Sequence, residues 1–326
     1  MAERKTGTVV HKELITPGLM RFRLAPEGES QFPDYEAGQY IALRRDDCKL
    51  TRKTGVGQDG KPIYEPEYDP WGRQTVGPVT HFYSIASAPF DTREHGWLEF
   101  VVALEDGVHG LPGRLSEALF GMGQETGCEL TYHNRIAGDF TLDARVQDAQ
   151  SVLMVGTGTG VAPFVSMVKE LAARSDGSDG RRYTLVHTNR TALELAYQDA
   201  LFEIEAAGRF DFMYVPTISR PAQDVAIDER IGQGRASNVV RHIYGLPTAE
   251  EDKQTNAKSD VSRVAAELAL TRLVHPVLPR HVHVSDLRER VAPVSSVLLT
   301  CGNPASLADL RSTAARREIR FELEEW

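Results

Sequence analysis

A glycine-rich turn between an apolar run and a helix pattern constrains the fold more than any other feature of this sequence. The apolar run spans 151–155, and the helix pattern begins near Pro163, a residue suited to a first helical turn. Between them stand Gly156, Thr157, Gly158, Thr159 and Gly160. A strand that enters a helix through such a turn is typical of a parallel α/β sheet, and its glycines let the backbone approach a bound phosphate.

The two parts of the chain follow different secondary-structure patterns. Short runs rich in Val, Ile, Phe and Tyr predict strands at 7–14, 20–24, 39–44, 80–86 and 98–104. From 151 onward, strands predicted at 151–155, 183–187, 210–218 and 296–301 alternate with helices predicted at 162–173, 192–207 and 306–316. We therefore predict two domains: an N-terminal antiparallel β-barrel over 1–146 and a C-terminal parallel-sheet α/β nucleotide-binding domain over 147–326.

Two stretches interrupt this pattern. Residues 44–78 are rich in glycine, proline and charge, and residues 246–260 are polar and almost without large apolar side chains. We predict that both form surface loops.

Composition argues against several classes of protein. A formal net charge of -9 disfavours binding to nucleic acid, which needs a concentrated basic surface. No run of about eighteen apolar residues occurs and the first residues lack the apolar core of a signal peptide, so we expect a cytoplasmic chain without membrane insertion. The three cysteines are widely spaced, which argues against disulfides, an iron–sulfur cluster or another metal site. The oligomeric state is open, and a monomer is expected.

Aromatic and polar residues alternate in the strand predicted at 80–86. His81 and Tyr83 share one face, and Phe82 points to the other, which we expect to be the barrel core. Tyr83 would lie along a bound ring system, and Ser84 would present its hydroxyl to a ring nitrogen where the strand turns. Because such strands are more often core than cofactor site, this segment alone leaves both interpretations open.

A second segment of the first domain has the residues of an anion site. After the run at 98–104, the chain presents small residues and a helix start at Gly113, Arg114, Leu115 and Ser116. Unpaired backbone N–H groups and the arginine charge suit a pyrophosphate. The alternative is a simple loop with a Gly-Pro turn.

Taken in order, these segments resemble the ferredoxin–NADP reductase superfamily, and most of all its bacterial ferredoxin/flavodoxin–NADP reductases. The barrel of that family carries Arg-x-Tyr-Ser and a glycine-led pyrophosphate loop, and its second domain carries Gly-Thr-Gly-Thr-Gly-x-Ala-Pro-Phe, which residues 156–164 match closely. The resemblance implies FAD bound by 81–84 and 113–116, and NADP(H) bound at 156–163. His81 stands where the motif has arginine; histidine is mostly neutral at pH 7, so the phosphate anchor is weaker or displaced.

The choice between NADP and NAD is expected after the third strand of the second domain. Ser219 and Arg220 follow that strand, and Arg235 follows a Gly-Gln-Gly sequence. A ribose 2′-phosphate favours arginine and hydroxyl donors. In the bacterial reductases that this chain resembles, such residues hold the phosphate, which implies NADP, with Arg190 assisting; the alternative is that these arginines are solvated loop residues.

The resemblance also assigns the residues beside the reacting rings. Cys301, with Gly302, Asn303 and Pro304, lies at a strand end and is implied to orient the nicotinamide. Trp326 is implied to cover part of the FAD, and with Ser84 and Cys301 it completes the catalytic set. The alternatives are a buried structural cysteine and a frayed terminus.

The implied activity is that of an FAD-dependent oxidoreductase, a ferredoxin/flavodoxin–NADP reductase. It would exchange hydride with NADP(H) and single electrons with ferredoxin or flavodoxin as transient partners. A basic cluster in the first insertion is either the carrier's docking patch or a solvated loop: Arg44, Arg45, Lys49, Arg52, Lys53 and Lys61. Two rival functions stay open, the reductase component of an oxygenase and a non-catalytic flavin-binding subunit.

Overall fold

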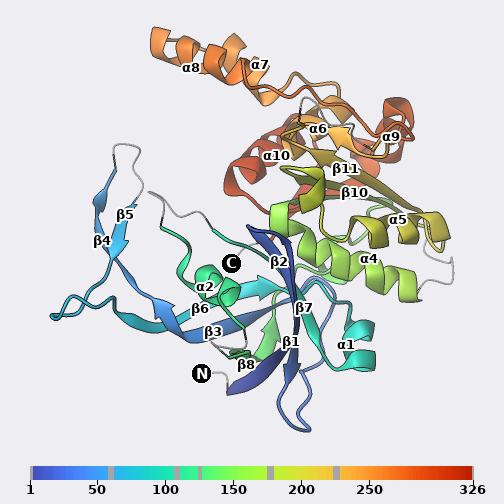
Figure 1. Cartoon of the computed structure of the whole chain (residues 1–326). Helices are drawn as coiled ribbons and strands as arrows, with labels where there is room; N and C mark the ends of the chain where they lie inside the picture. The colour runs from blue at the N-terminus through green and yellow to red at the C-terminus, as the bar shows by residue number, and fades with distance from the viewer. Residues whose placement is uncertain are drawn as a thin grey trace. The chain divides into compact units, whose positions relative to one another are not determined.

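The computed structural model describes residues 3–57, 62–105, 111–123, 127–174, 180–222 and 228–324. The chain divides into two compact units, Met1–Gly138 and Asp139–Trp326. The first unit is built on an antiparallel sheet and the second on a parallel sheet with helices (Figure 1). The predicted fold class is therefore confirmed.

The first unit is a curled antiparallel sheet whose six strands run in the order β6-β3-β8-β1-β2-β7. After β6, the backbone N–H of Ala86 donates to the carbonyl of Glu99 on β7 at 2.8 Å, so the two ends of the sheet meet there. The core inside the curl includes a stacked pair, Phe22 and Phe100, with ring centroids 5.1 Å apart. The elements are β1 (Arg4–Thr16), β2 (Leu19–Pro26), β3 (Tyr40–Lys49), β6 (Val76–Ser84), α1 (Pro89–His95), β7 (Leu98–Ala103), α2 (Arg114–Phe120) and β8 (Glu129–Ala137).

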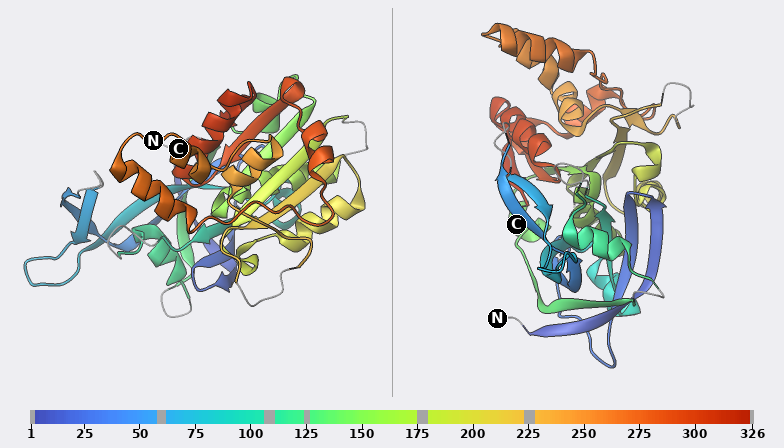
Figure 2. Two further views of the ribbon diagram at one scale, coloured as in Figure 1. Left: turned by 90° about the horizontal axis from the view of Figure 1, so that it is seen from above. Right: turned by 60° about the vertical axis from the view of Figure 1, so that its left-hand side comes forward.

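The first insertion is not a loop, as we predicted, but a β-hairpin. Strands β4 (Thr51–Val56) and β5 (Pro62–Pro66) pair antiparallel, and both views of Figure 2 show them as a two-stranded ribbon. Leu50 anchors the base of the hairpin, because its N–H donates to Thr75 and its carbonyl accepts from Glu67, at 2.9 and 3.0 Å. The prediction was wrong because glycine and charge content does not reveal which backbone groups find a partner strand.

The second unit is a parallel sheet of six strands in the order β12-β11-β10-β9-β13-β14. Helices α4 and α5 contact each other on one face of this sheet, and α6 contacts α9 and α10 on the other (Figure 1). The strands are β9 (Ser151–Thr157), β10 (Arg182–Asn189), β11 (Phe212–Ile218), β12 (Gly232–Gln233), β13 (Ser296–Cys301) and β14 (Arg320–Leu323). The helices that cover the sheet are α4 (Ala162–Arg174), α5 (Gln198–Ala207), α6 (Ala236–Ile243), α9 (Val284–Arg290) and α10 (Pro304–Arg316).

Two helical predictions in the second unit need correction. The helix predicted at 192–207 is interrupted, because Tyr197 adopts a left-handed conformation, with φ of 66°, between the short turn Ala192–Glu194 and α5. The loop predicted at 246–260 contains α7 (Ala249–Thr255) and the first residue of α8 (Asp260–Leu270). Thr248 and Glu251 form a capping box at the start of α7. This pair marks a helix start, whereas the polar composition of the segment suggested a loop.

The segment between the two patterns belongs to the second unit. Residues 139–146, which we placed in the first domain, contain α3 (Leu142–Arg145), capped by the Thr141 hydroxyl. Arg145 pairs with Glu322 on β14 at 2.7 Å, which ties α3 to the parallel sheet. In the part of the chain that the structure describes, no helix is long and apolar enough to cross a membrane.

Candidate functional site

The glycine-rich turn and the Cys301 segment meet at one end of the parallel sheet. Strands β9 and β13 are neighbours, with Gly156 opposite Cys301 in the register. The hydroxyl of Thr157 accepts a hydrogen bond from the backbone N–H of Asn303 at 3.0 Å. Because the strands are parallel, both motifs lie at the carboxyl ends, where open α/β sheets bind their ligands.

Glycine is required at the contact between these two motifs. A Cβ on Gly160 would lie 2.5 Å from the carbonyl carbon of Cys301 and 2.6 Å from Cα of Gly302. Gly302 itself has φ of 134°, and a Cβ there would lie 2.6 Å from the carbonyl oxygen of Thr157. The main chain of Gly160 therefore lies directly against the main chain of Cys301 and Gly302, and the Thr157 side chain lies beside this contact.

The middle glycine of the turn has a different environment. Gly158 has φ of 59°, and nothing lies within 4 Å of the position of an added Cβ. It begins a short 3₁₀ turn, Gly158–Val161, that leads directly into α4, and Pro163 lies buried in the first turn of that helix. The first N–H groups of a helix lack partners within the helix, so this turn combines open space with backbone donors, as a phosphate site requires.

The Cys301 thiol is buried and hydrogen-bonded to an acidic residue that sequence reasoning missed. Its Sγ donates to Oε2 of Glu324 at 2.8 Å, and the two residues are 3% and 5% exposed. Burial, with the nearby carboxylate of Glu324, raises the pKa of this thiol well above its usual value, so it stays protonated at neutral pH. A protonated thiol is a poor nucleophile, which agrees with a positioning role for Cys301.

Glu324 reaches this site because the end of the chain joins the sheet. Strand β14 pairs in parallel with β13, and the Glu324 N–H then donates to the carbonyl of Thr300 at 3.1 Å. No local motif marks this glutamate in the sequence, since only strand pairing brings it to Cys301. Trp326, the residue that we predicted at the tail, lies outside the described residues.

The residues predicted to read a 2′-phosphate follow three neighbouring strands. Backbone hydrogen bonds of 2.9 Å join Ser219 to Asn189, Arg220 to Arg190 and Gly234 to Ile218. Strands β10, β11 and β12 are parallel, so Arg190, Arg220 and Arg235 all lie just beyond their carboxyl ends. The tertiary structure thus brings these three sequence segments to the same edge of the sheet.

The side chains of the three arginines have different partners. Arg190 forms a two-point ion pair with the buried Glu194, at 2.7 and 3.1 Å. Arg235 lies 3.5 Å from an oxygen of Glu250. Arg220 is exposed and makes no side-chain ion pair with any residue that the structure describes.

In the first unit, Phe82 does not lie on the face of β6 that we predicted for it. Phe82 does not point into the core: it is 53% exposed, and its ring packs edge-on against Tyr40 with centroids 5.2 Å apart. Tyr83 instead packs against the core cluster, and burial raises the pKa of its phenol beyond its usual value. His81 is exposed, and Ser84 ends the strand opposite Tyr40.

The residues predicted at the pyrophosphate adopt two kinds of role. Leu115 is buried, and the Ser116 hydroxyl donates to the carbonyl of Gly113 at 3.0 Å and accepts from the N–H of Glu105 at 3.3 Å. These side chains hold the turn that precedes α2. Arg114 is partly exposed and has no ion-pair partner in the described chain, so it is the charge that remains for an anion.

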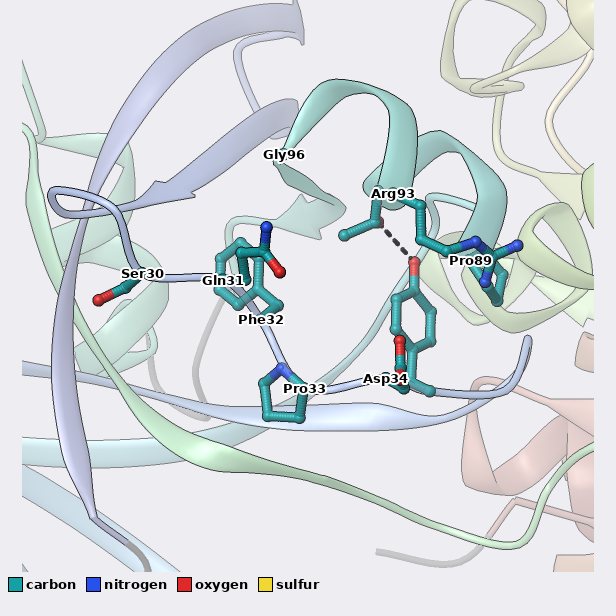
Figure 3. Close-up of a pocket in the computed structure, with 10 residues that line it drawn as sticks. Ser30, Gln31, Phe32, Pro33, Asp34, Pro89, Arg93 and Gly96 are labelled. Atoms are coloured by element: carbon teal, nitrogen blue, oxygen red, sulfur yellow. Dashed lines mark hydrogen bonds between the residues drawn. The ribbon is translucent and has the colours of Figure 1, made fainter.

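One small pocket of the first unit contains none of the predicted site residues. It lies between residues 30–35 and α1, where the Tyr35 hydroxyl is 2.8 Å from that of Thr92 (Figure 3). Among the residues that the structure describes, no three or more His, Cys, Asp or Glu side chains lie close enough together to hold a metal ion.

Comparisons with known proteins relate the chain to one group of reductases. Residues 154–254 match the model of the oxidoreductase NAD-binding domain. A flavohemoprotein from Bordetella pertussis is 30% identical over 200 residues, which cover 56% of this chain and 37% of that protein. A flavodoxin/ferredoxin–NADP reductase from Shigella flexneri is 28% identical over 174 residues, covering 53% of this chain and 64% of that protein. The chain thus spans less than two thirds of the length of either relative.

Solved structures resemble the whole chain at low sequence identity. A ferredoxin NADP+ reductase from Neisseria gonorrhoeae, solved with bound FAD and NADP, has a TM-score of 0.56 and 20% identity, with 99% of each chain covered. A flavohemoglobin from Malassezia yamatoensis has a TM-score of 0.59 and 14% identity, covering 100% of this chain and 61% of that one. At these identities the likeness establishes the fold alone.

Proposed function

Because the chain belongs to the ferredoxin–NADP reductase superfamily, we propose that it is an FAD-dependent reductase that takes hydride from NADPH. It would then pass single electrons to a ferredoxin or flavodoxin. The observation that supports this proposal is the backbone contact between the glycine-rich turn and Cys301–Gly302, because it brings backbone donors suited to a phosphate beside a buried, protonated thiol.

The second unit has the residues to hold the nicotinamide nucleotide. The open space at Gly158 and the start of α4 suit the pyrophosphate. Cys301 would contact the nicotinamide, with its thiol oriented by Glu324, while Asn303 and Pro304 begin α10 beside it. Ser219 and Arg220 would bind the 2′-phosphate, with smaller contributions from Arg190 and Arg235, whose charges are partly neutralised.

The first unit has residues that fit FAD. Tyr83 and Ser84 would contact the ring, and Arg114 with the backbone of 113–116 would contact the phosphates. His81 is exposed, so a phosphate can reach it. When bound, FAD accepts a hydride and releases electrons singly, which joins a two-electron donor to one-electron carriers. Trp326 would cover part of the bound FAD.

The carrier's docking surface is less well supported than the cofactor sites. Within the basic cluster of the first insertion, Arg44 and Arg45 pair with neighbouring aspartates and Lys49 pairs with Glu117. These ion pairs favour the solvated interpretation for half of the cluster. Arg52 and Lys53 are exposed on β4 and stay in the proposal, whereas Lys61 lies outside the described residues.

The test begins with the purified full-length chain and excess FAD. A protein that binds the flavin and whose yellow colour bleaches on mixing with NADPH in a stopped-flow instrument supports the reductase. Colour that persists would indicate a flavin-binding subunit, and a chain that takes up no FAD would refute the proposal. Turnover is then compared with ferredoxin, flavodoxin and an oxygenase component as acceptors, which separates the carrier reductase from the oxygenase reductase.

A further inference from the structure

A carboxylate from the inserted helix α7 is fixed beside one of the three arginines. Glu250 is only 7% exposed, and Oε2 of its carboxylate accepts a hydrogen bond from Nδ2 of Asn238 on α6 at 2.8 Å. The other oxygen lies 3.5 Å from Nη1 of Arg235. Buried carboxylates are held by partners, and these two contacts account for both oxygens of Glu250.

The position of Glu250 is set by the contacts that hold α7 against α6. Asn238 also accepts a hydrogen bond from the N–H of Ala249 at 2.8 Å, so a single amide clamps the start of α7 onto α6. One turn further along α6, Arg241 pairs with Asp252 of α7 at 2.5 Å. The negative charge of Glu250 therefore keeps a fixed place relative to α6.

Arg235 is accessible although it has this partner. Its side chain is 66% exposed, and its backbone precedes the first turn of α6. The 3.5 Å separation is at the limit of a hydrogen bond, so the carboxylate neutralises the guanidinium without enclosing it. An anion that approaches Arg235 from solvent therefore competes with Glu250 for the guanidinium.

We propose that Glu250 is a specificity-determining residue that reduces the preference of this chain for NADPH over NADH. The inference rests on the proposed function, in which Arg235 lies at the 2′-phosphate. The two nucleotides differ only in that phosphate, so a fixed carboxylate beside Arg235 penalises NADPH and leaves NADH nearly unaffected. Because Arg190 is held more closely still, by a two-point ion pair with Glu194, Arg220 is left as the main cation for the phosphate.

The test removes the charge of Glu250 and keeps its shape. Glu250→Gln retains an oxygen for the Asn238 amide, and binding of adenosine 2′,5′-bisphosphate and of 5′-AMP is measured on the full-length protein by calorimetry. We expect the Kd of the bisphosphate to fall by only about three- to tenfold, because Arg235 is largely exposed and water screens its interaction with the phosphate. The Kd of 5′-AMP should change by less than about twofold. The NADPH/NADH ratio of kcat/KM should rise by the same factor as the bisphosphate affinity.

Two variants show whether the effect passes through Arg235. Glu267→Gln, on the exposed face of α8, makes the same change in net charge and should leave both affinities unaltered. In an Arg235→Ala background, Glu250→Gln should lose its effect. Arg235→Ala by itself should weaken the bisphosphate less than Arg220→Ala does, a comparison that does not depend on how well the Glu250 variant folds.

The outcomes separate the inference from the proposed function. An unchanged or weaker affinity for the bisphosphate in Glu250→Gln overturns the inference, as does an equal gain in Glu267→Gln or a gain that survives in the Arg235→Ala background. An unmodified chain that binds neither nucleotide fragment overturns the proposed function and the inference with it.

Discussion

Replacing Gly160 with alanine tests whether the glycine-rich turn and the Cys301 segment depend on direct backbone contact. The added Cβ would lie 2.5 Å from the carbonyl carbon of Cys301 and 2.6 Å from Cα of Gly302. Carbon atoms in contact prefer about 3.5–4.0 Å, so one backbone must move by roughly 1 Å. Strands β9 and β13 are hydrogen-bonded neighbours, which leaves little freedom for that movement.

The expected cost follows from the kind of atoms involved. Adding a methyl group to a packed interior costs about 1–3 kcal/mol when side chains can adjust. Main-chain atoms cannot relieve the contact by changing rotamer, so we expect about 3 kcal/mol for Gly160→Ala. For a unit of this size, that loss lowers Tm by roughly 6–12 °C.

Gly158→Ala is the matched control in the same turn. Its added Cβ meets nothing within 4 Å, and only the φ of 59° is unfavourable. That conformation costs a non-glycine residue about 1 kcal/mol, which corresponds to roughly 2–4 °C in Tm. Differential scanning calorimetry of the two variants separates the collision from the backbone strain.

A functional readout accompanies the calorimetry. Movement of the turn away from Cys301 should raise the KM for NADPH in Gly160→Ala while FAD content stays at the level of the unmodified chain. If Gly160→Ala melts within about 2 °C of Gly158→Ala and keeps its KM, the two backbones do not pack as described, and the observation behind the proposed function is lost.

Three further predictions address charge and pH. Arg220→Ala should reduce kcat/KM for NADPH by about ten- to a hundredfold with little change for NADH, as steady-state kinetics with both nucleotides will show. Glu324→Gln replaces the charged acceptor of the Cys301 thiol with a neutral amide oxygen and should slow flavin reduction about tenfold in stopped-flow experiments, without loss of bound FAD. Burial lowers the pKa of His187 to about 3. The unfolded chain binds a proton at this histidine near pH 6.5, so the free energy of unfolding has its full value above pH 6.5 and is lower by about 2 kcal/mol at pH 5. His187→Gln should flatten this pH dependence in denaturant titrations.

Much of the second unit follows from local sequence. The strand-to-helix steps at 151–174 and 296–316 are predictable because a short apolar run, a glycine-rich or asparagine-capped turn and a helix start are coded within a few consecutive residues. Parallel strands of that kind meet at their carboxyl ends, so the proximity of Gly156 to Cys301 also follows once the sheet is recognised. The capping box of Thr248 and Glu251 is a local signal of the same kind, and it marks the start of α7.

Other features depend on pairing between residues far apart in the chain. An alternating strand shows which residues share a face, but not which face meets the core, and for this reason the prediction that Phe82 points into the core was wrong. The hairpin of β4 and β5 needed partner strands that charge and glycine content do not specify.

Sequence alone determined where this chain has a glycine-rich turn, a thiol at a strand end and arginines after its strands, because each of these features is local. The tertiary structure decided which groups each of these side chains faces. Glu324 accepts the hydrogen bond of the Cys301 thiol, and Glu194 and Glu250 neutralise two of the three arginines. Electrostatic interactions act between groups that are close in space. Glu324 follows β14 and Glu250 lies on α7, and only the folded chain brings these carboxylates close to Cys301 and Arg235.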